Sequence, residues 1–235
     1  MTRPARRSDL PAIALLGDDR GHPSHLELNA LVPVLARDLG VRATWAPTAE
    51  RFDPRAFDGV WLVPGSPYDS DDRVRAALTV VREEGIAFLG TCGGMQYAVM
   101  EFLRSVAGRA ATHAESDGER DDNAVAALAC SLRGQERVVT PVPGSRFASW
   151  VATPFVGMHY CGYAPTPSAI ESLRAHGVVV GATAEDAGPE VLEFPDHPFF
   201  VTSMFQPHIG TLAGRPVHRL VHAFVDAVRR GAATA

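Results

Sequence analysis

The chain has 235 residues, of which 46 % are apolar, and a formal net charge of −5. This composition suffices for one large layered core, and the negative balance argues against a basic surface for nucleic acid, so no nucleic-acid partner is expected. The three cysteines, Cys92, Cys130 and Cys161, lack metal-type spacing, and the apolar run at 12–17 is too short for a signal peptide or a membrane span. We therefore expect a cytoplasmic protein with free thiols, without a metal and without a membrane partner.

The first half of the sequence predicts strands that alternate with helices. Apolar runs indicate strands at residues 12–17, 41–45, 59–63 and 86–89. Helical spacing indicates helices at 24–40 with Ser24 as the N-cap, from Asp71 or Asp72 to Glu84, and at 95–106. This alternation predicts a parallel sheet with right-handed crossovers, in which active sites gather at the carboxyl ends of the strands.

The second half has a different pattern, because short strand-like runs are broken by glycine and proline. Strands are expected at 124–130, 137–142, 155–160, 178–183, 191–194 and 199–205, with a polar loop at 113–123, a hairpin between 178 and 194, and a last helix at 215–230. The prediction for the whole chain is an α/β fold: a central, mostly parallel sheet flanked by helices, with antiparallel additions in the second half. We expect a single domain over residues 1–235, with its core at about 12–230.

The junction between the fourth strand and its helix has the spacing of a nucleophile elbow. Its sequence is Gly90-Thr91-Cys92-Gly93-Gly94, the thiol version of a pattern in which the nucleophile sits in strained backbone between glycines. The N-terminus of the following helix favours a thiolate and a nearby oxyanion. Cys92 is therefore the candidate nucleophile, and the alternative is a buried core thiol.

Five blocks in chain order resemble the class I glutamine amidotransferase family, in particular the C-terminal glutaminase domain of CTP synthase and its stand-alone relatives. They are residues 63–67, 88–96, 98–108, 112–115 and 197–208. The resemblance implies a three-layer, flavodoxin-like fold. It also implies a mechanism in which Cys92 attacks an amide, forms a thioester and releases ammonia.

The same resemblance implies roles for other residues. Backbone N–H groups at Gly65 and Gly93 would hold the oxyanion. Substrate contacts are expected from four side chains: Ser66, Gln96, Glu115 and Tyr160.

Two segments depart from the family pattern. The family ends its last strand with Phe-His-Pro-Glu, whereas this chain has Phe205-Gln206-Pro207-His208, so the usual base is replaced by a side chain that cannot take a proton. Gln206 can still orient a substrate or hydrogen-bond the thiol. The segment corresponding to the family's arginine-rich carboxylate-binding stretch, residues 157–163, contains no arginine.

Two histidines are candidates for the missing base. His208 lies two residues beyond the usual position, and His159 lies in the segment that borders the substrate site in the family. Cys161 is either a small buried hydrophobe or a second, resolving thiol. The pairs His22/His25 and His218/His222 have no third ligand at zinc spacing, so no metal role is expected for them.

Three functions remain open at this stage. The first is a cysteine-dependent amidotransferase-like enzyme for a small-molecule amide or related C–N substrate, without a cofactor and with a separate ammonia-accepting partner enzyme. The second is a catalytically degenerate binding or regulatory protein. The third is a thiol hydratase, isomerase or redox enzyme that uses Cys92 with His159 or Cys161. A homodimer is an open alternative for the assembly.

Overall fold

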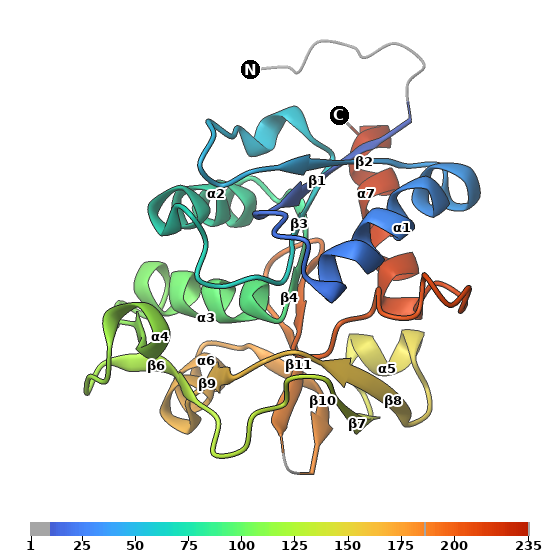
Figure 1. Cartoon of the computed structure of the whole chain (residues 1–235). Coiled ribbons are helices and arrows are strands. Elements are labelled where there is room, and N and C mark those ends of the chain that lie inside the picture. Colours follow the sequence, from blue (N-terminus) through green and yellow to red (C-terminus); the bar gives the residue numbers. More distant parts are fainter. Residues whose placement is uncertain (1–9, 186, 235) are drawn as a thin grey trace.

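The computed structural model describes residues 10–185 and 187–234. Nine strands of this part of the chain form one sheet with the order β2-β1-β3-β4-β12-β11-β10-β7-β8 (Figure 1). The first five in this order are parallel: β2 (Arg42–Ala46), β1 (Ala12–Leu16), β3 (Gly59–Leu62), β4 (Ala87–Thr91) and β12 (Phe200–Ser203). The other four continue the sheet in antiparallel fashion: β11 (Gly188–Glu193), β10 (Val179–Ala184), β7 (Gln135–Pro141) and β8 (Phe155–His159).

Helices cover both faces of the sheet, because successive strand residues point to opposite sides. On one face, Ile13 and Leu15 pack in a cluster with α1 (Pro23–Leu39), α5 (Arg146–Trp150) and α7 (Arg219–Thr234). On the other face, Ala14 and Leu16 pack with α2 (Asp71–Glu83), α3 (Gly93–Ser105) and α6 (Pro167–Ala175). Each cluster of buried apolar side chains joins one face of the sheet to its helices. The molecule therefore has three layers: helices, sheet and helices.

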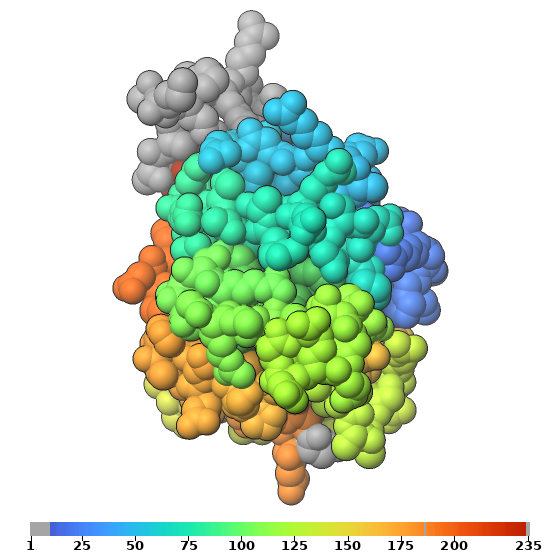
Figure 2. Space-filling view, turned by 90° about the vertical axis from the view of Figure 1, so that its left-hand side faces the viewer, coloured from blue at the N-terminus to red at the C-terminus, as the bar shows by residue number. Residues whose placement is uncertain are grey.

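A smaller sheet lies beside α3. It is formed by β5 (Thr112–His113), β6 (Asn123–Ala127) and β9 (Tyr163–Pro165), with the short helix α4 (Ala114–Asp117) after β5. Figure 2 shows α2 and α3 stacked on one face of the molecule, with the yellow-green segment that follows α3 next to them. The polar loop expected at 113–123 is thus partly wrong, since local hydrogen bonds of His113 and Asp117 order this segment.

The start of α1 differs from the prediction. The N-cap is His22 rather than Ser24: the His22 Nδ1 atom accepts a hydrogen bond from the Ser24 backbone N–H at 3.2 Å. Pro23 fits the first helical turn because its missing N–H needs no partner there. Ser24 is instead buried inside the helix, and Gly40 ends the helix with φ +57°. This register places His22 at the edge of the site described below.

The expected fold class is confirmed by this architecture, including the antiparallel pairing of residues 179–184 with 188–193. A further 3₁₀ turn, η1 (Pro54–Ala56), precedes β3. The single-domain prediction over 1–235 also includes residues 1–9, 186 and 235, which lie outside the described residues. Within the described ranges, no helix combines the length and the apolar character needed to cross a membrane.

Candidate active site

Cys92 lies at a sharp turn between β4 and α3. Its backbone has φ 53° and ψ −110°, a region that non-glycine residues rarely adopt. Its N–H donates to the Ser203 carbonyl at 2.8 Å, which ties the turn to the end of β12. Strained backbone of this kind persists only where the surrounding structure holds it, and such positions cluster at active sites.

The glycines around Cys92 permit close packing that no side chain would allow. A Cβ atom on Gly94 would lie 2.2 Å from the Leu62 carbonyl oxygen, and one on Gly93 would lie 2.9 Å from the Ser66 backbone nitrogen. A Cβ on Gly90 would lie 2.8 Å from the Gly94 carbonyl oxygen. The glycine pattern therefore has the packing role expected of an elbow.

The loop after β3 is held against the elbow by His25. The His25 Nδ1 atom accepts from the Arg20 backbone N–H at 3.0 Å, so Nε2 carries the proton and donates to the Pro64 carbonyl at 2.9 Å. Gly65 follows with φ +131°, in the left-handed range that favours glycine. His25 thus orients the loop that carries Gly65 and Ser66, and both of its ring nitrogens are engaged.

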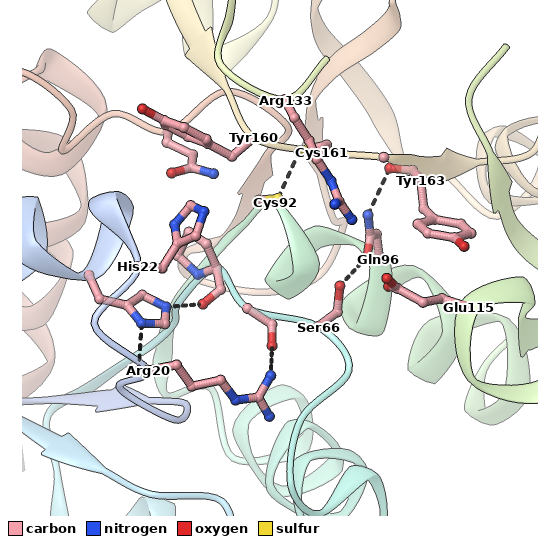
Figure 3. Close-up of a pocket in the computed structure, with 15 residues that line it drawn as sticks. Arg20, His22, Ser66, Cys92, Gln96, Glu115, Arg133, Tyr160, Cys161 and Tyr163 are labelled. Atoms are coloured by element: carbon pink, nitrogen blue, oxygen red, sulfur yellow. Dashed lines mark hydrogen bonds between the residues drawn. The ribbon is translucent and has the colours of Figure 1, made fainter. Parts of the chain in front are cut away.

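A cavity of about 380 Å³ opens at this edge of the sheet (Figure 3). Cys92, Cys161 and Gln206 line it and are 7 %, 2 % and 2 % exposed. Other predicted site residues line it as well: Gly65, Ser66, Gln96, Glu115 and Tyr160. The structure therefore brings most of the sequence-predicted set together around the Cys92 sulfur.

The side chain in contact with the Cys92 sulfur is Cys161. The two Sγ atoms are 2.7 Å apart, and both cysteines are free thiols. The contact with Cys161 lowers the pKa of Cys92 despite burial, and the Gly93 N–H acts in the same direction. Conversely, the contact with Cys92, burial and the negative charge of Glu190 hold the pKa of Cys161 well above its ordinary value. Of the two thiols, Cys92 is therefore the more readily deprotonated, and Cys161 keeps its proton more firmly.

Gln206 follows β12 and lines the cavity beside Cys92. Its backbone N–H donates to the Met158 carbonyl at 2.9 Å, which fixes its position. Both side-chain amide atoms are buried and have no hydrogen-bond partner among the described residues. Since a buried amide without partners is costly, this group is available to a molecule bound in the cavity.

His208 is not brought to the cavity. It is 1 % exposed, its Nε2 atom lies 2.9 Å from the Ser24 Oγ atom, and its ring packs against Trp61 on the α1 side of the sheet. Burial lowers the pKa of His208 to about 3. Pro207 turns the chain away from the cavity. The prediction that His208, two residues beyond the usual position of the base, faces Cys92 is therefore wrong.

His159 is also occupied elsewhere. Its Nε2 atom lies 3.0 Å from both carboxylate oxygens of Glu190, and both side chains are fully buried. Glu190 in β11 additionally accepts from the Phe205 N–H at 3.2 Å, next to Gln206. Sequence reasoning missed this partner, because Glu190 and His159 are 31 positions apart and no motif joins them.

Gln96 orients its neighbours with its whole amide group. Its Oε1 atom accepts from Ser66 Oγ and from His113 Nε2, each at 3.0 Å, and its Nε2 atom donates to the Tyr163 carbonyl at 2.8 Å. His113 can donate from Nε2 because its Nδ1 atom accepts from the Glu115 N–H, and burial lowers the pKa of His113 to about 4. Gln96 is therefore a positioning residue for Ser66 and Tyr163.

Sequence reasoning gave no site role to four cavity residues with a basic or imidazole side chain: Arg20, His22, His25 and Arg133. Arg20 pairs with Asp69 at 2.6 Å. The Arg133 guanidinium lies against Gly162, where a Cβ atom would be 3.6 Å from its Nε atom, and Figure 3 shows it reaching into the cavity toward Gln96. It has no hydrogen-bonded partner within the described ranges, and it lowers the pKa of Glu115, which burial raises. No sequence motif marks Arg133, because it lies between β6 and β7, outside the five segments that resemble the amidotransferase family.

Comparison with known proteins agrees with this geometry, although no family model matches the chain. The CTP synthase of Methanothrix thermoacetophila is 30 % identical over 194 residues, covering 77 % of this chain and 35 % of that protein. The CTP synthase of Archaeoglobus fulgidus is 31 % identical over 173 residues, covering 68 % and 32 %. The chain thus spans about a third of the length of the curated relatives it matches.

Solved structures give the fold. The glutaminase domain of the Trypanosoma brucei CTP synthase, with bound acivicin, superposes with a TM-score of 0.80 at 21 % identity, covering 94 % of both chains. A glutamine amidotransferase from Thermotoga maritima gives 0.61 at 14 % identity, covering 94 % of this chain and 84 % of that one. The chain has the class I glutamine amidotransferase fold. Its resemblance to the CTP synthase glutaminase domain is confirmed, and the homology supports a glutamine amidotransferase-like function.

In this chain, the groups around the Cys92 sulfur come from three other segments. A second thiol, Cys161, contacts the sulfur, the Gln206 amide lines the same cavity, and Arg133 provides a cation.

Proposed function

We propose that the protein is a cysteine-dependent, glutamine amidotransferase-like enzyme that cleaves the C–N bond of a small carboxamide. The observation that carries the proposal is the Cys92 thiol, which has a lowered pKa, is held at a glycine-flanked elbow and faces a cavity of about 380 Å³. A thiolate in such a position is a strong nucleophile at neutral pH.

The thiolate attacks the amide carbonyl carbon and gives a tetrahedral intermediate. Its oxyanion is stabilised by backbone N–H groups of the elbow and the facing loop, at Gly93 and Gly65. The C–N bond then breaks, the acyl group stays on Cys92 as a thioester, and the nitrogen leaves with a proton as ammonia. Water hydrolyses the thioester and regenerates the thiolate.

Proton transfer is assigned to Cys161 rather than to a histidine. Its thiol contacts the reacting sulfur, whereas His208 and His159 are bonded to Ser24 and Glu190. The raised pKa makes Cys161 a weak acid near pH 7, and general acid catalysis is most efficient when the pKa is near the working pH. We therefore expect slow turnover.

Substrate recognition is assigned to the opposite charges of Arg133 and Glu115. Arg133 provides a cation for a carboxylate, and Glu115 provides an anion for an ammonium group, a combination that fits the α-amino acid end of a glutamine-like amide. Gln206 adds an unpaired amide donor and acceptor beside the reacting group. The released ammonia would pass to an acceptor enzyme or domain, by analogy with the CTP synthases to which the chain is similar.

The test is covalent labelling with a diazo-ketone analogue of glutamine. Intact-mass analysis is expected to show one adduct on the native protein, none on Cys92→Ser, and an unchanged adduct on Cys130→Ser, since Cys130 is exposed outside the cavity. Protection by glutamine would identify the substrate class. Absence of an adduct, or an adduct that survives Cys92→Ser, would overturn the proposal.

A second candidate is a non-catalytic binding protein of the same fold. It is favoured by one observation: no imidazole contacts the Cys92 sulfur within the described residues, so the usual base is missing. A rise in melting temperature with glutamine, combined with the absence of an adduct, would select this candidate over the enzyme.

A further inference from the structure

The two buried thiols of the cavity are placed as a redox pair. Cys92 follows β4 and Cys161 follows β8, so 69 positions of sequence separate two sulfurs that are 2.7 Å apart. A disulfide needs a separation of about 2.05 Å, so bond formation requires an approach of roughly 0.7 Å.

Both sulfurs are held in this relation by the fold. The Cys92 backbone is fixed at the elbow by its bond to the Ser203 carbonyl. The Cys161 carbonyl accepts from the Leu132 N–H at 2.9 Å, and its sulfur lies 3.5 Å from the Met204 carbonyl oxygen. Cys161 lies in the short connection between β8 and β9, and these two contacts hold it from both sides.

The two thiols have unequal character, which suits a two-step oxidation. The pKa of Cys92 is lowered and the pKa of Cys161 is raised, so Cys92 is the thiol that ionises first. The thiolate is the form that attacks an oxidant, while a neighbouring protonated thiol acts next as the resolving group. The unpaired Gln206 amide lies at the same place and can donate to a departing oxygen.

We propose that Cys92 and Cys161 form a redox-active dithiol that a hydroperoxide converts to an intramolecular disulfide. The Cys92 thiolate attacks the terminal oxygen of the hydroperoxide, the O–O bond breaks, and an alcohol or water leaves after taking up a proton. Cys92 becomes a sulfenic acid. The Cys161 thiol then attacks that sulfur, the S–O bond breaks, and the Cys161 proton leaves with the hydroxyl as water.

This activity goes beyond the proposed amide chemistry and needs no amide substrate. The hydroperoxide is reduced by two electrons, and the two thiols are oxidised to one disulfide. A small dithiol or glutathione-like reductant entering the cavity reverses the step by thiol–disulfide exchange. While the disulfide persists, Cys92 cannot form a thioester, so oxidation also switches off the proposed enzyme.

Trypsin digestion separates the three cysteines, which makes the test direct. Cys92 lies in the tryptic peptide 83–104, Cys130 in 121–133 and Cys161 in 147–174. The reduced protein is treated with one equivalent of hydrogen peroxide, alkylated with N-ethylmaleimide and digested without reductant. Mass spectrometry is expected to find peptide 83–104 joined to 147–174, with Cys130 alkylated and the thiol count reduced from three to one. Dithiothreitol is expected to restore all three.

Variants separate the two steps. Cys161→Ser is expected to accumulate a Cys92 sulfenic acid that dimedone captures, without a disulfide, while Cys130→Ser is expected to behave as the native protein. The proposal is overturned if peroxide oxidises Cys130 while Cys92 and Cys161 remain alkylatable, or if Cys92 is oxidised past the sulfenic acid as fast in the native protein as in Cys161→Ser. The native-protein assay needs no variant to fold, and the diazo-ketone adduct is read independently, so either proposal can fail alone.

Discussion

The Nε2 atom of His159 lies 3.0 Å from both carboxylate oxygens of Glu190, and neither side chain is exposed to solvent. The same carboxylate accepts from the Phe205 N–H, so one buried group joins β8, β11 and the end of β12. Truncation of one member of a buried polar network leaves the others without partners in a medium where water cannot replace them. The pair therefore supports the wall of the cavity behind Cys161 and Gln206.

Glu190→Ala is expected to lower the free energy of unfolding by about 3 kcal/mol, because it leaves the His159 imidazole and the Phe205 N–H unpaired. Urea denaturation measures this loss. Glu136→Ala is the matched control: Glu136 is exposed on β7, and a surface change of this kind stays within about 0.5 kcal/mol. Equal losses in the two variants would show that the buried pair has no special role.

The thiol contact is expected to control the reactivity of Cys92. Because the hydrogen bond from Cys161 is the largest cause of the lowered pKa of Cys92, Cys161→Ala is expected to raise the pH midpoint for alkylation of Cys92. Iodoacetamide rates as a function of pH, read on peptide 83–104, measure this midpoint. Cys130→Ala is the control and should leave it unchanged. A midpoint that stays or falls in Cys161→Ala would contradict the assigned direction of the hydrogen bond.

Recognition of an acidic head group is expected to depend on Arg133. Loss of a charge-assisted hydrogen bond costs about 1.5–3 kcal/mol, so Arg133→Gln should slow diazo-ketone labelling at low analogue concentration by about 10- to 100-fold. Arg120→Gln is the control, since Arg120 is exposed and pairs with Asp122.

The same experiment with an analogue whose α-carboxylate is converted to an amide separates charge from packing. The effect of Arg133→Gln should then disappear. If it persists with the neutral analogue, Arg133 acts on the shape of the cavity rather than on the substrate charge.

Protonation of buried histidines is expected to destabilise the fold in acid. Folding lowers the pKa of His208 from about 6.5 to about 3. The contribution of His208 to the free energy of unfolding is complete above pH 6.5. It is lost as the pH falls from 6.5 toward 3, because the unfolded chain binds the proton more readily. This contribution amounts to about 2 kcal/mol between pH 7 and pH 5.

Urea denaturation at pH 7 and pH 5 tests this linkage in the native protein and in His208→Gln. The variant is expected to lose about 2 kcal/mol less than the native protein over this interval, since glutamine does not titrate. His176→Gln is the control, because His176 is exposed at the end of α6. Identical pH dependence in His208→Gln and the native protein would contradict the buried, neutral state of His208.

The sequence predicts the elements and the elbow well, because both depend on local patterns. Apolar runs predict β1, β3 and β4 within a residue or two, and glycine spacing predicts the turn at Cys92. The groups around the sulfur could not be predicted in the same way. Cys161 meets Cys92 across 69 positions, and Arg133 enters from a segment without a motif, so only the folded chain brings them together. The predicted N-cap of α1, Ser24, is wrong because histidine rarely serves as an N-cap. The observed N-cap, His22, lies at the cavity.

Gly94→Ala is expected to be destabilising even though alanine is the better helix former. The new Cβ atom would lie 2.2 Å from the Leu62 carbonyl oxygen, and backbone cannot yield as a flexible side chain can, so α3 must move away from β3. Overpacking of this kind costs about 1–3 kcal/mol, and the shift should also slow labelling of Cys92 by the diazo-ketone. Gly231→Ala in α7 is the matched control: its Cβ would meet no atom within 4 Å, so the higher helix propensity of alanine should stabilise the protein by about 0.5–1 kcal/mol. Thermal unfolding of both variants gives the comparison. If Gly94→Ala were as stable and as reactive as the native protein, the close approach of α3 to β3 would not be what holds the elbow in place.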